Sequence, residues 1–200
     1  MKNSKTRIMM ECSVLIALSV VLSFIILYTA PFGGTVTCFS MVPLVIISVR
    51  HGIAWGMGSA FVYSVFELIR YMGYVTAVPS LTGIIAVILL DYLVAFTLIG
   101  LSGVFRGIKL LKNEKVNMGL MTFMGVTLAF FMRFACHFIS GAFVWYEITK
   151  NAAAAGDYVQ SVGMWTYSFV YNITYLGPET LLTLMAVPVV VLLLKYLKKA

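Results

Sequence analysis

Long apolar runs separated by short polar segments dominate the pattern of this chain. Five of them are long enough to cross about 30 Å of hydrocarbon as helices rising 1.5 Å per residue. They cover residues 8–30, 53–73, 82–105, 117–147 and 163–194. A sixth run, residues 39–49, is short enough to be a re-entrant or partly buried segment. The pattern predicts an all-α, polytopic membrane protein with five or six spans.

The basic residues decide between five and six spans. Most of the 14 Lys and Arg residues lie in four clusters. These are Lys2, Lys5 and Arg7; Arg50; Arg106, Lys109, Lys112 and Lys115; and Lys195, Lys198 and Lys199. With six crossings all four clusters lie on one face, and the connections on the other face carry only Lys150. Because cytoplasmic loops are enriched in Lys and Arg, we predict six transmembrane helices with both termini cytoplasmic.

Composition supports a multi-pass protein of the cell membrane. The chain of 200 residues is 62% hydrophobic and 10% charged, which leaves too little polar surface to cover a water-soluble globule. The net charge of +7 does not indicate nucleic-acid binding, because the basic residues stand between apolar spans. No polar segment is long enough to fold separately, so we predict a single substrate-binding domain over residues 1–200.

Asp91 is the clearest functional signal, because it lies inside the apolar run of residues 84–101. An acidic side chain at mid-membrane costs roughly 2.5–3.5 kcal/mol on insertion scales, so such residues usually mark a pathway or a binding site. Four other candidates fall in the same outer half, counted from the predicted helix ends: His137, Trp145, Tyr167 and Asn172.

Together these side chains offer one anion, an imidazole, an amide and two electron-rich rings. This set suits a flat, cationic, nitrogen-rich heterocycle, which a carboxylate can pair with and aromatic rings can stack on. Taken singly, each aromatic residue also fits an interfacial belt, and the His and Asn side chains also fit hydrogen bonds within the bundle. Their shared depth favours a common pocket.

Two further charged pairs suggest structural contacts. Arg133 and Glu179 lie at comparable depth on the last two spans, and we expect an intramembrane ion pair between them. Glu67 and Arg70 are three residues apart and can pair on one helix face.

Other motifs bear on partners and cofactors. Ser13 and Ala17 form a small-xxx-small pair, which lets another helix approach closely, either in the bundle or on a partner protein. No G-x-x-x-x-G-K-[ST] phosphate loop occurs, so an ATP-driven role needs separate ATP-binding subunits. The three cysteines show no CxxC spacing, and we predict neither a metal site nor a cofactor.

Three segments carry a family resemblance: DYLVAFTLIGLSG from Asp91, RFACHFISGAFVW from Arg133 and YSFVYNITYLGPE from Tyr167. Together they resemble the thiamine-specific S-component (ThiT) family of energy-coupling factor (ECF) transporters. The resemblance implies that the pocket is lined by Asp91, Tyr92, His137, Trp145, Tyr167 and Asn172. It also implies that Ser13 and Ala17 contact the transmembrane coupling subunit, which works with two ATP-binding subunits.

The chain departs from the family pattern in two places. The family acid is usually Glu, whereas position 91 is Asp. The family also has a Trp in the connection after the first helix, and residues 31–40 contain none, so Phe32 and Phe39 are the aromatic residues that could replace it.

The leading hypothesis is a high-affinity thiamine-binding S-component of an ATP-driven vitamin importer. Two alternatives stay open: an S-component for another vitamin or precursor such as a hydroxymethylpyrimidine, and a proton-coupled secondary carrier, since Asp91 and His137 can titrate. An enzyme is disfavoured because the chain has only two histidines and shows no nucleophile–base pair, so no catalytic residue is predicted. The expected partners are thiamine, the coupling and ATP-binding subunits and the lipid bilayer.

Overall fold

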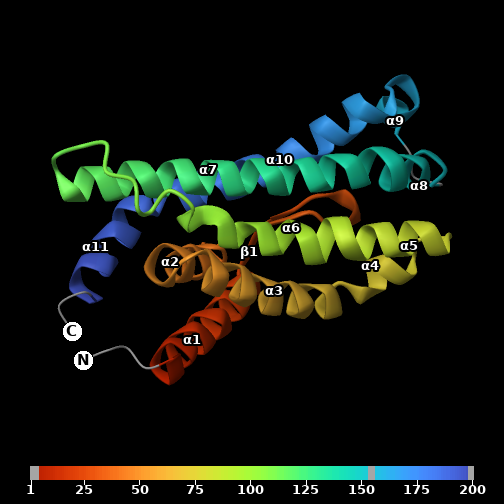
Figure 1. Cartoon of the computed structure of the whole chain (residues 1–200). Helices are drawn as coiled ribbons and strands as arrows, with labels where there is room; N and C mark the ends of the chain where they lie inside the picture. The colour runs from red at the N-terminus through yellow and green to blue at the C-terminus, as the bar shows by residue number, and fades with distance from the viewer. Residues whose placement is uncertain (1–4, 153–155, 198–200) are drawn as a thin grey trace.

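Helices make up most of the molecule in the computed structural model, which describes residues 5–152 and 156–197 (Figure 1). Lys2, Lys198 and Lys199 of the predicted basic clusters therefore lie outside the described residues. Four described helical stretches are long and apolar enough to cross a membrane: Lys5–Ser23, Leu81–Gly103, Glu114–Lys150 and Met164–Tyr196. The predicted helical membrane protein is thereby confirmed.

The first predicted span ends earlier than expected. Helix α1 covers Lys5–Ser23, and strand β1 (Ile26–Thr29) then pairs antiparallel with strand β2 (Thr35–Thr37). The prediction of helix to residue 30 is therefore wrong. The 3₁₀ turn η1 (Pro31–Gly33) joins the strands, and Gly33 has φ +104°, a left-handed conformation that favours glycine.

The short sixth run is a helix. Helix α2 covers Val42–His51, with Pro43 in its first turn, where the missing N–H costs no helical hydrogen bond. It ends at Gly52, which has φ +98° and donates its N–H to Ser48 O over 2.9 Å. Helix α3 (Ile53–Arg70) follows, and the short helix α4 (Met72–Thr76) comes after it.

The next two spans are continuous helices with irregular turns. The first comprises α5 (Leu81–Val87), the π-helical turn η2 (Ile88–Leu93), α6 (Val94–Thr97) and the 3₁₀ segment η3 (Leu98–Gly103). The second comprises α7 (Glu114–Ser140), the π-helical turn η4 (Gly141–Trp145) and α8 (Tyr146–Lys150). The chain ends with α9 (Asp157–Ser161), α10 (Met164–Met185) and α11 (Val187–Leu197).

Small residues let the central helices cross closely. A Cβ at Gly100 would collide with the backbone of Gly56 and Met57 on α3. Ser48 of α2 donates its hydroxyl to Gly100 O over 2.5 Å and accepts from Gly103 N over 2.8 Å. Because helices in lipid associate by packing and hydrogen bonding, these contacts hold α2, α3 and η3 together.

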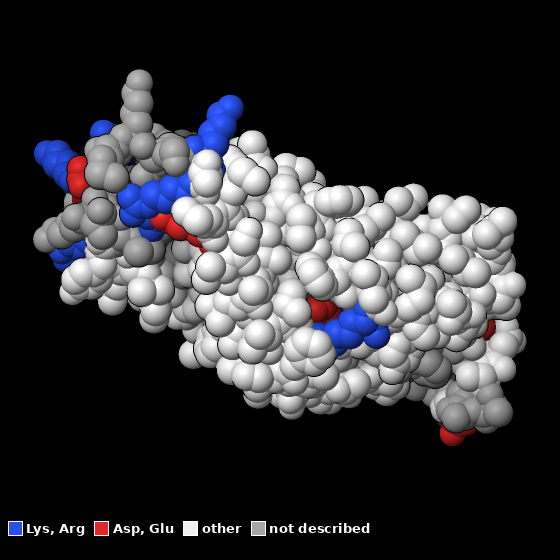
Figure 2. All heavy atoms as spheres, turned by 90° about the horizontal axis from the view of Figure 1, so that it is seen from below, with Lys and Arg blue, Asp and Glu red and all other residues white. Residues whose placement is uncertain are grey.

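Charge separates the two ends of the molecule. The start of α1, the end of α11 and the connection before α7 lie at one end, and α5, α8 and α9 lie at the other (Figure 1). Lys and Arg side chains gather at the first end, which we call the basic end, whereas most of the remaining visible surface is uncharged (Figure 2). This distribution is the one expected of a protein with a basic cytoplasmic face.

One of the two predicted ion pairs forms. Arg70 Nη1 lies 3.2 Å from Glu67 Oε1, which confirms that pair. The pair between Arg133 and Glu179 is wrong, because Glu179 instead accepts from Thr37 N over 2.7 Å and from Thr37 Oγ1 over 2.8 Å. The unpredicted hairpin brings these donors to α10, and the Arg133 guanidinium lies over the Phe96 ring at 4.3 Å.

Candidate ligand-binding site

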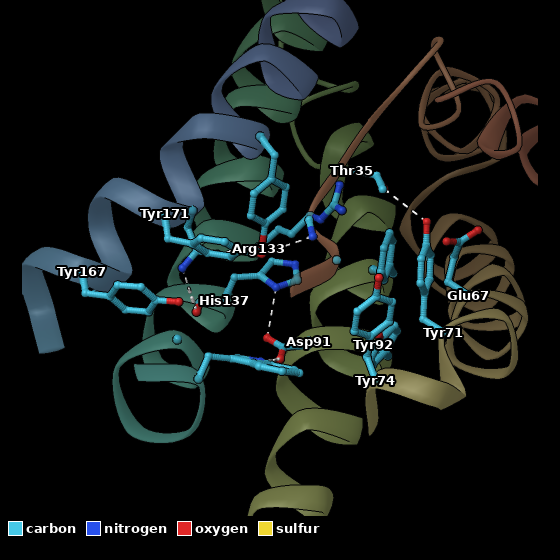
Figure 3. Close-up of a pocket in the computed structure, with 17 residues that line it drawn as sticks. Thr35, Glu67, Tyr71, Tyr74, Asp91, Tyr92, Arg133, His137, Tyr167 and Tyr171 are labelled. Atoms are coloured by element: carbon cyan, nitrogen blue, oxygen red, sulfur yellow. Dashed lines mark hydrogen bonds and ion pairs between the residues drawn. The ribbon is translucent and has the colours of Figure 1, made fainter. Parts of the chain in front are cut away.

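A cavity of about 80 Å³ lies between two walls of the bundle (Figure 3). One wall comes from α7, η4 and α10, the other from α3, α4 and η2, and Gly33, Gly34 and Thr35 of the hairpin border it. A single water needs roughly 10–15 Å³ measured this way, so the cavity holds several. All six residues predicted to bind a ligand line it: Asp91, Tyr92, His137, Trp145, Tyr167 and Asn172.

Asp91 is the centre of a hydrogen-bond network that joins η2 to α7 and η4. Its Oδ2 accepts from Ser140 Oγ and from Trp145 Nε1, each over 2.7 Å. Its Oδ1 lies 3.0 Å from His137 Nδ1, which donates its hydrogen (Figure 3). Asp91 is only 8% exposed, so these donors replace the water that a carboxylate otherwise needs. The network also fixes the ring orientations of His137 and Trp145.

The two π-helical turns supply the central contacts of this network. Asp91 lies in η2 and Trp145 ends η4. A π-helical turn inserts an extra residue into the helix and re-aims the side chains around it, and such turns occur frequently at functional sites. Gly141 at the start of η4 leaves room for α10, because a Cβ there would collide with Ser168 and lie 2.9 Å from Asn172 Nδ2.

Asn172 braces α10 against α7. Its Nδ2 donates to His137 O over 3.1 Å and to Ser168 O over 2.8 Å, while its Oδ1 accepts from Tyr175 Oη over 2.7 Å. Both the nitrogen and the oxygen of the Asn172 amide therefore form hydrogen bonds within the protein. Free hydrogen-bonding capacity on this wall includes the second lone pair of Asn172 Oδ1 and the Nε2 of His137, which is buried without a partner among the described residues.

Aromatic rings face the cavity from both walls. On one side, Tyr167 stacks on Tyr171 with ring centroids 5.8 Å apart and 15° between the planes. On the other side, Tyr71, Tyr74 and Tyr92 lie together, with the Tyr71 and Tyr92 centroids 6.5 Å apart (Figure 3). The cavity thus combines two buried carboxylates, Asp91 and the Glu67 that pairs with Arg70, with flat, electron-rich surfaces, an arrangement that suits a cationic aromatic ligand.

A family model covers nearly the whole chain. The family described as Thiamine transporter protein (Thia_YuaJ) matches residues 9–199. The chain belongs to this family. It is therefore a multi-pass membrane transport protein rather than an enzyme.

Individual proteins that are similar to this chain are also named as thiamine transporters. The thiamine transporter ThiT of Lacticaseibacillus paracasei is 26% identical over 192 residues, which span 91% of this chain and 85% of that protein. ThiT of Bacillus subtilis is 26% identical over 176 residues, which span 86% and 83% of the two proteins. The solved structure of ThiT from Listeria monocytogenes has a TM-score of 0.69 at 22% identity, covering 96% of this chain and 95% of that one, and shows the same fold.

Several cavity residues of this thiamine transporter family member were not predicted to bind. Tyr71, Tyr74, Tyr171 and Tyr175 line the cavity, but in the sequence they are indistinguishable from interfacial aromatic residues. Arg133 also lines it, and its Nε and Nη1 are buried without hydrogen-bond partners among the described residues. In the sequence, a charged Arg133 inside a predicted apolar span was the feature that could have indicated a functional role.

The hairpin closes the side of the cavity where the resemblance placed a Trp. A Cβ at Gly34 would lie 2.5 Å from the Tyr175 ring, so the chain approaches this ring more closely than a side chain allows. The hydroxyl of Tyr171 donates to Pro31 O and accepts from Gly34 N. Phe39, one expected substitute, is not among the residues that line the cavity, and the side chain of Phe32, the other, lies outside the described parts.

Ser13 and Ala17 lie away from the cavity, on an exposed face of α1. Ser13 Oγ donates back to Met9 O over 2.9 Å, so its polar group is already bonded within the helix. Exposed apolar residues surround the pair, with Met10 59% and Val14 68% exposed. Within the part of the chain that the structure describes, no other helix covers this small-residue face.

Proposed function

We propose that this chain is the high-affinity thiamine-binding S-component of an ATP-driven ECF importer and captures thiamine in the cavity around Asp91. Thiamine joins an aminopyrimidine to a permanently cationic thiazolium ring. The observation that carries the proposal is a buried carboxylate bonded to Trp145 and His137 between two aromatic walls. Membership of the thiamine transporter family supports it.

Each residue has a role that follows from its contacts. Asp91 supplies the charge that balances the thiazolium and holds the Trp145 ring in position for stacking. Tyr167, already stacked on Tyr171, extends the aromatic surface, and Tyr92 faces it from the other wall. His137 Nε2 and Asn172 Oδ1 hydrogen-bond the edges of the ligand.

The fold is also compatible with the predicted topology of six crossings, both termini cytoplasmic, in a single domain. In this proposal the hairpin and α2 together make the second crossing, because α2 alone spans about 15 Å. Irregular backbone is tolerated at membrane depth where protein buries it or where it lines a cavity, as Gly33 and Gly34 do. The cavity then opens towards the outer half of the membrane.

Partner subunits complete the transporter. The exposed face of α1 around Ser13 and Ala17 offers the close helix approach that a transmembrane coupling subunit needs. Two separate ATP-binding subunits supply hydrolysis, because the chain has no phosphate-binding loop. Uptake by cells therefore requires all these subunits. Uptake by this chain alone, driven by a proton gradient, would instead establish a secondary carrier.

Tryptophan fluorescence of the purified protein during thiamine titration tests the binding proposal. Of the three tryptophans only Trp145 lines the cavity, so we expect saturable quenching at submicromolar thiamine. Trp145→Phe should remove most of the quenching. Trp165→Phe should retain it, because Trp165 is 45% exposed and packs on Phe138 and Phe143 instead.

A pyrimidine precursor is the second candidate ligand. It is favoured by one observation, which is that both oxygens of Asp91 already accept hydrogen bonds from the protein and so do not demand a cationic partner. Hydroxymethylpyrimidine titrated alone and in competition distinguishes the two. Quenching by hydroxymethylpyrimidine with no response to thiamine would refute the thiamine assignment.

A further inference from the structure

The connection between η3 and α7 carries a surface that the cavity does not explain. Residues 104–113, which we call the basic turn, contain three exposed cations, Arg106, Lys109 and Lys112. Beside them Leu110 is 65% and Leu111 43% exposed. Leucines displayed outward between lysines are typical of a segment that lies at a membrane surface, with its apolar side chains in the acyl region and its ammonium groups at the headgroups.

The basic turn is held in one shape by a buried side chain. Asn117, which is 9% exposed, accepts from Leu110 N over 2.7 Å and from Leu111 N over 3.0 Å. It also donates through Nδ2 to Ile108 O over 2.7 Å. The N–H groups of the two leucines are therefore anchored inward, which directs their side chains outward. The display of these leucines is thus built into the fold.

The cations around this turn lack acidic partners. Within the described residues, no salt bridge involves Arg106, Lys109, Lys112, Lys115 or Lys195. Lys115 lies in the first turn of α7 and Lys195 in the last turn of α11, and these two helices pack against each other. An anion placed beside several unpaired ammonium groups relieves their mutual repulsion. Figure 2 shows the basic end to which they belong.

The apolar surface beside these cations continues along the bundle. On α7, Val116 is 55% and Phe123 46% exposed, and on α11, Leu192 is 51% exposed. In a membrane-spanning chain such faces contact lipid tails. The lysines of the basic turn and of α11 stand where these faces end, which is the level of the headgroup phosphates.

We propose that the basic turn and the end of α11 bind the phosphate headgroup of an anionic phospholipid, with Leu110 and Leu111 inserted among its acyl chains. The lipid anchors this end of the bundle in its leaflet. The proposal does not depend on which vitamin the cavity binds.

Native mass spectrometry of the full-length protein tests this site. The protein is released from micelles containing equal amounts of phosphatidylglycerol and phosphatidylcholine with the same acyl chains, and the retained lipids are counted. We expect phosphatidylglycerol to be retained preferentially. Lys112→Gln and Lys109→Gln should each lower that preference about fivefold. Lys5→Gln, which removes the same charge from α1 at the same end, should leave it unchanged.

A second variant separates a built site from diffuse attraction. Asn117→Leu keeps every cation but removes the hydrogen bonds that shape the turn, and it should also lower the preference. The proposal is overturned if the wild type shows no preference for phosphatidylglycerol, or if Lys5→Gln lowers the preference as much as Lys112→Gln does. It is equally overturned if the lysine variants lose assembly with partner subunits while lipid selectivity is unchanged.

Discussion

The carboxylate of Asp91 accepts hydrogen bonds from three side chains of α7 and η4: His137, Ser140 and Trp145. Burying a carboxylate without such donors is costly, and these three donors replace the water that it loses. The donors of Ser140, His137 and Trp145 thus reach the short Asp91 side chain directly. Asp91 therefore orients the walls of the cavity, and its charge adds to those of Glu67 and Arg133, which also line it.

Replacing this carboxylate tests both roles. Asp91→Asn removes the charge and turns one oxygen into a donor that faces the Trp145 and Ser140 donors. We expect thiamine affinity to fall about 10- to 100-fold, since hydrogen bonds to charged groups contribute roughly 1.5–3 kcal/mol. Isothermal titration calorimetry measures the change. Glu147→Gln likewise replaces a carboxylate with an amide, at an exposed position on α8, and should not alter affinity. Equal affinities for wild type and Asp91→Asn would refute the charge role.

Gly34 tests the close approach of the hairpin to the cavity wall. In Gly34→Ala the new methyl group would lie 2.5 Å from the Tyr175 ring, so the hairpin or the ring must move. We expect a loss of about 1–3 kcal/mol in stability, as for other overpacked sites, together with weaker thiamine binding. Thermal unfolding in detergent and titration calorimetry measure these effects. Gly58→Ala, with nothing within 4 Å, is the control and should show neither.

At the scale of elements, irregular helical turns and glycine contacts position the site. The π-helical turns η2 and η4 place Asp91 and Trp145 opposite each other, and both lie within otherwise regular helical spans. The helices next to the cavity are packed closely through glycine, so their relative positions have little freedom. A rigid frame of this kind keeps the donors of Asp91 within hydrogen-bond distance.

The crossing of η3 and α3 is the most sensitive point of this frame. Gly100→Ala would place a Cβ against the backbone of Gly56 and Met57, and backbone atoms cannot rotate away as a side chain does. We expect a marked fall in melting temperature, or failure to accumulate folded protein, measured by thermal shift and size-exclusion chromatography. Gly107→Ala, which meets nothing within 4 Å, should be close to wild type. A stable Gly100→Ala protein would show that the helices can separate without loss.

At the scale of the whole molecule, the charge distribution defines an orientation. The described basic clusters lie at one end, and α8, which directly follows the cavity-lining turn η4, lies at the other (Figures 1 and 2). Lys and Arg remain on the cytoplasmic side during insertion. In the proposed topology, ligand therefore enters from outside and the basic end faces the cytoplasm.

Cysteine labelling in intact cells checks this orientation. In a background with Cys12, Cys38 and Cys136 replaced, Asp157→Cys should react with a membrane-impermeant thiol reagent, because Asp157 is exposed at the end opposite the basic end. Lys109→Cys should react only after the cells are opened. Labelling of Lys109→Cys in intact cells would reverse the proposed topology.

Much of this architecture follows from local sequence. Hydropathy locates helices because lipid leaves the backbone no other partner than itself, so the helices starting near residues 53, 82, 117 and 163 were predicted closely, although the helix from residue 53 is not among the described stretches apolar enough to span a membrane. The clusters of Lys and Arg between the apolar runs indicate which helix ends lie on the same side of the membrane. The buried Asp91 also stands out locally, since a carboxylate in an apolar run needs a reason.

Only the tertiary structure decided the hairpin, the π-helical turns and the partners of the buried charges. Residues 24–30 are apolar enough for a helix, but Glu179 and Tyr171, far along the chain, supply hydrogen bonds that an extended hairpin can use. The same contact supplies the hydrogen bonds of Glu179, and among the described residues no salt bridge joins it to Arg133. Hydropathy records how much each residue prefers lipid to water, whereas these features depend on which donor and acceptor meet across the bundle, and that is a property of the folded chain.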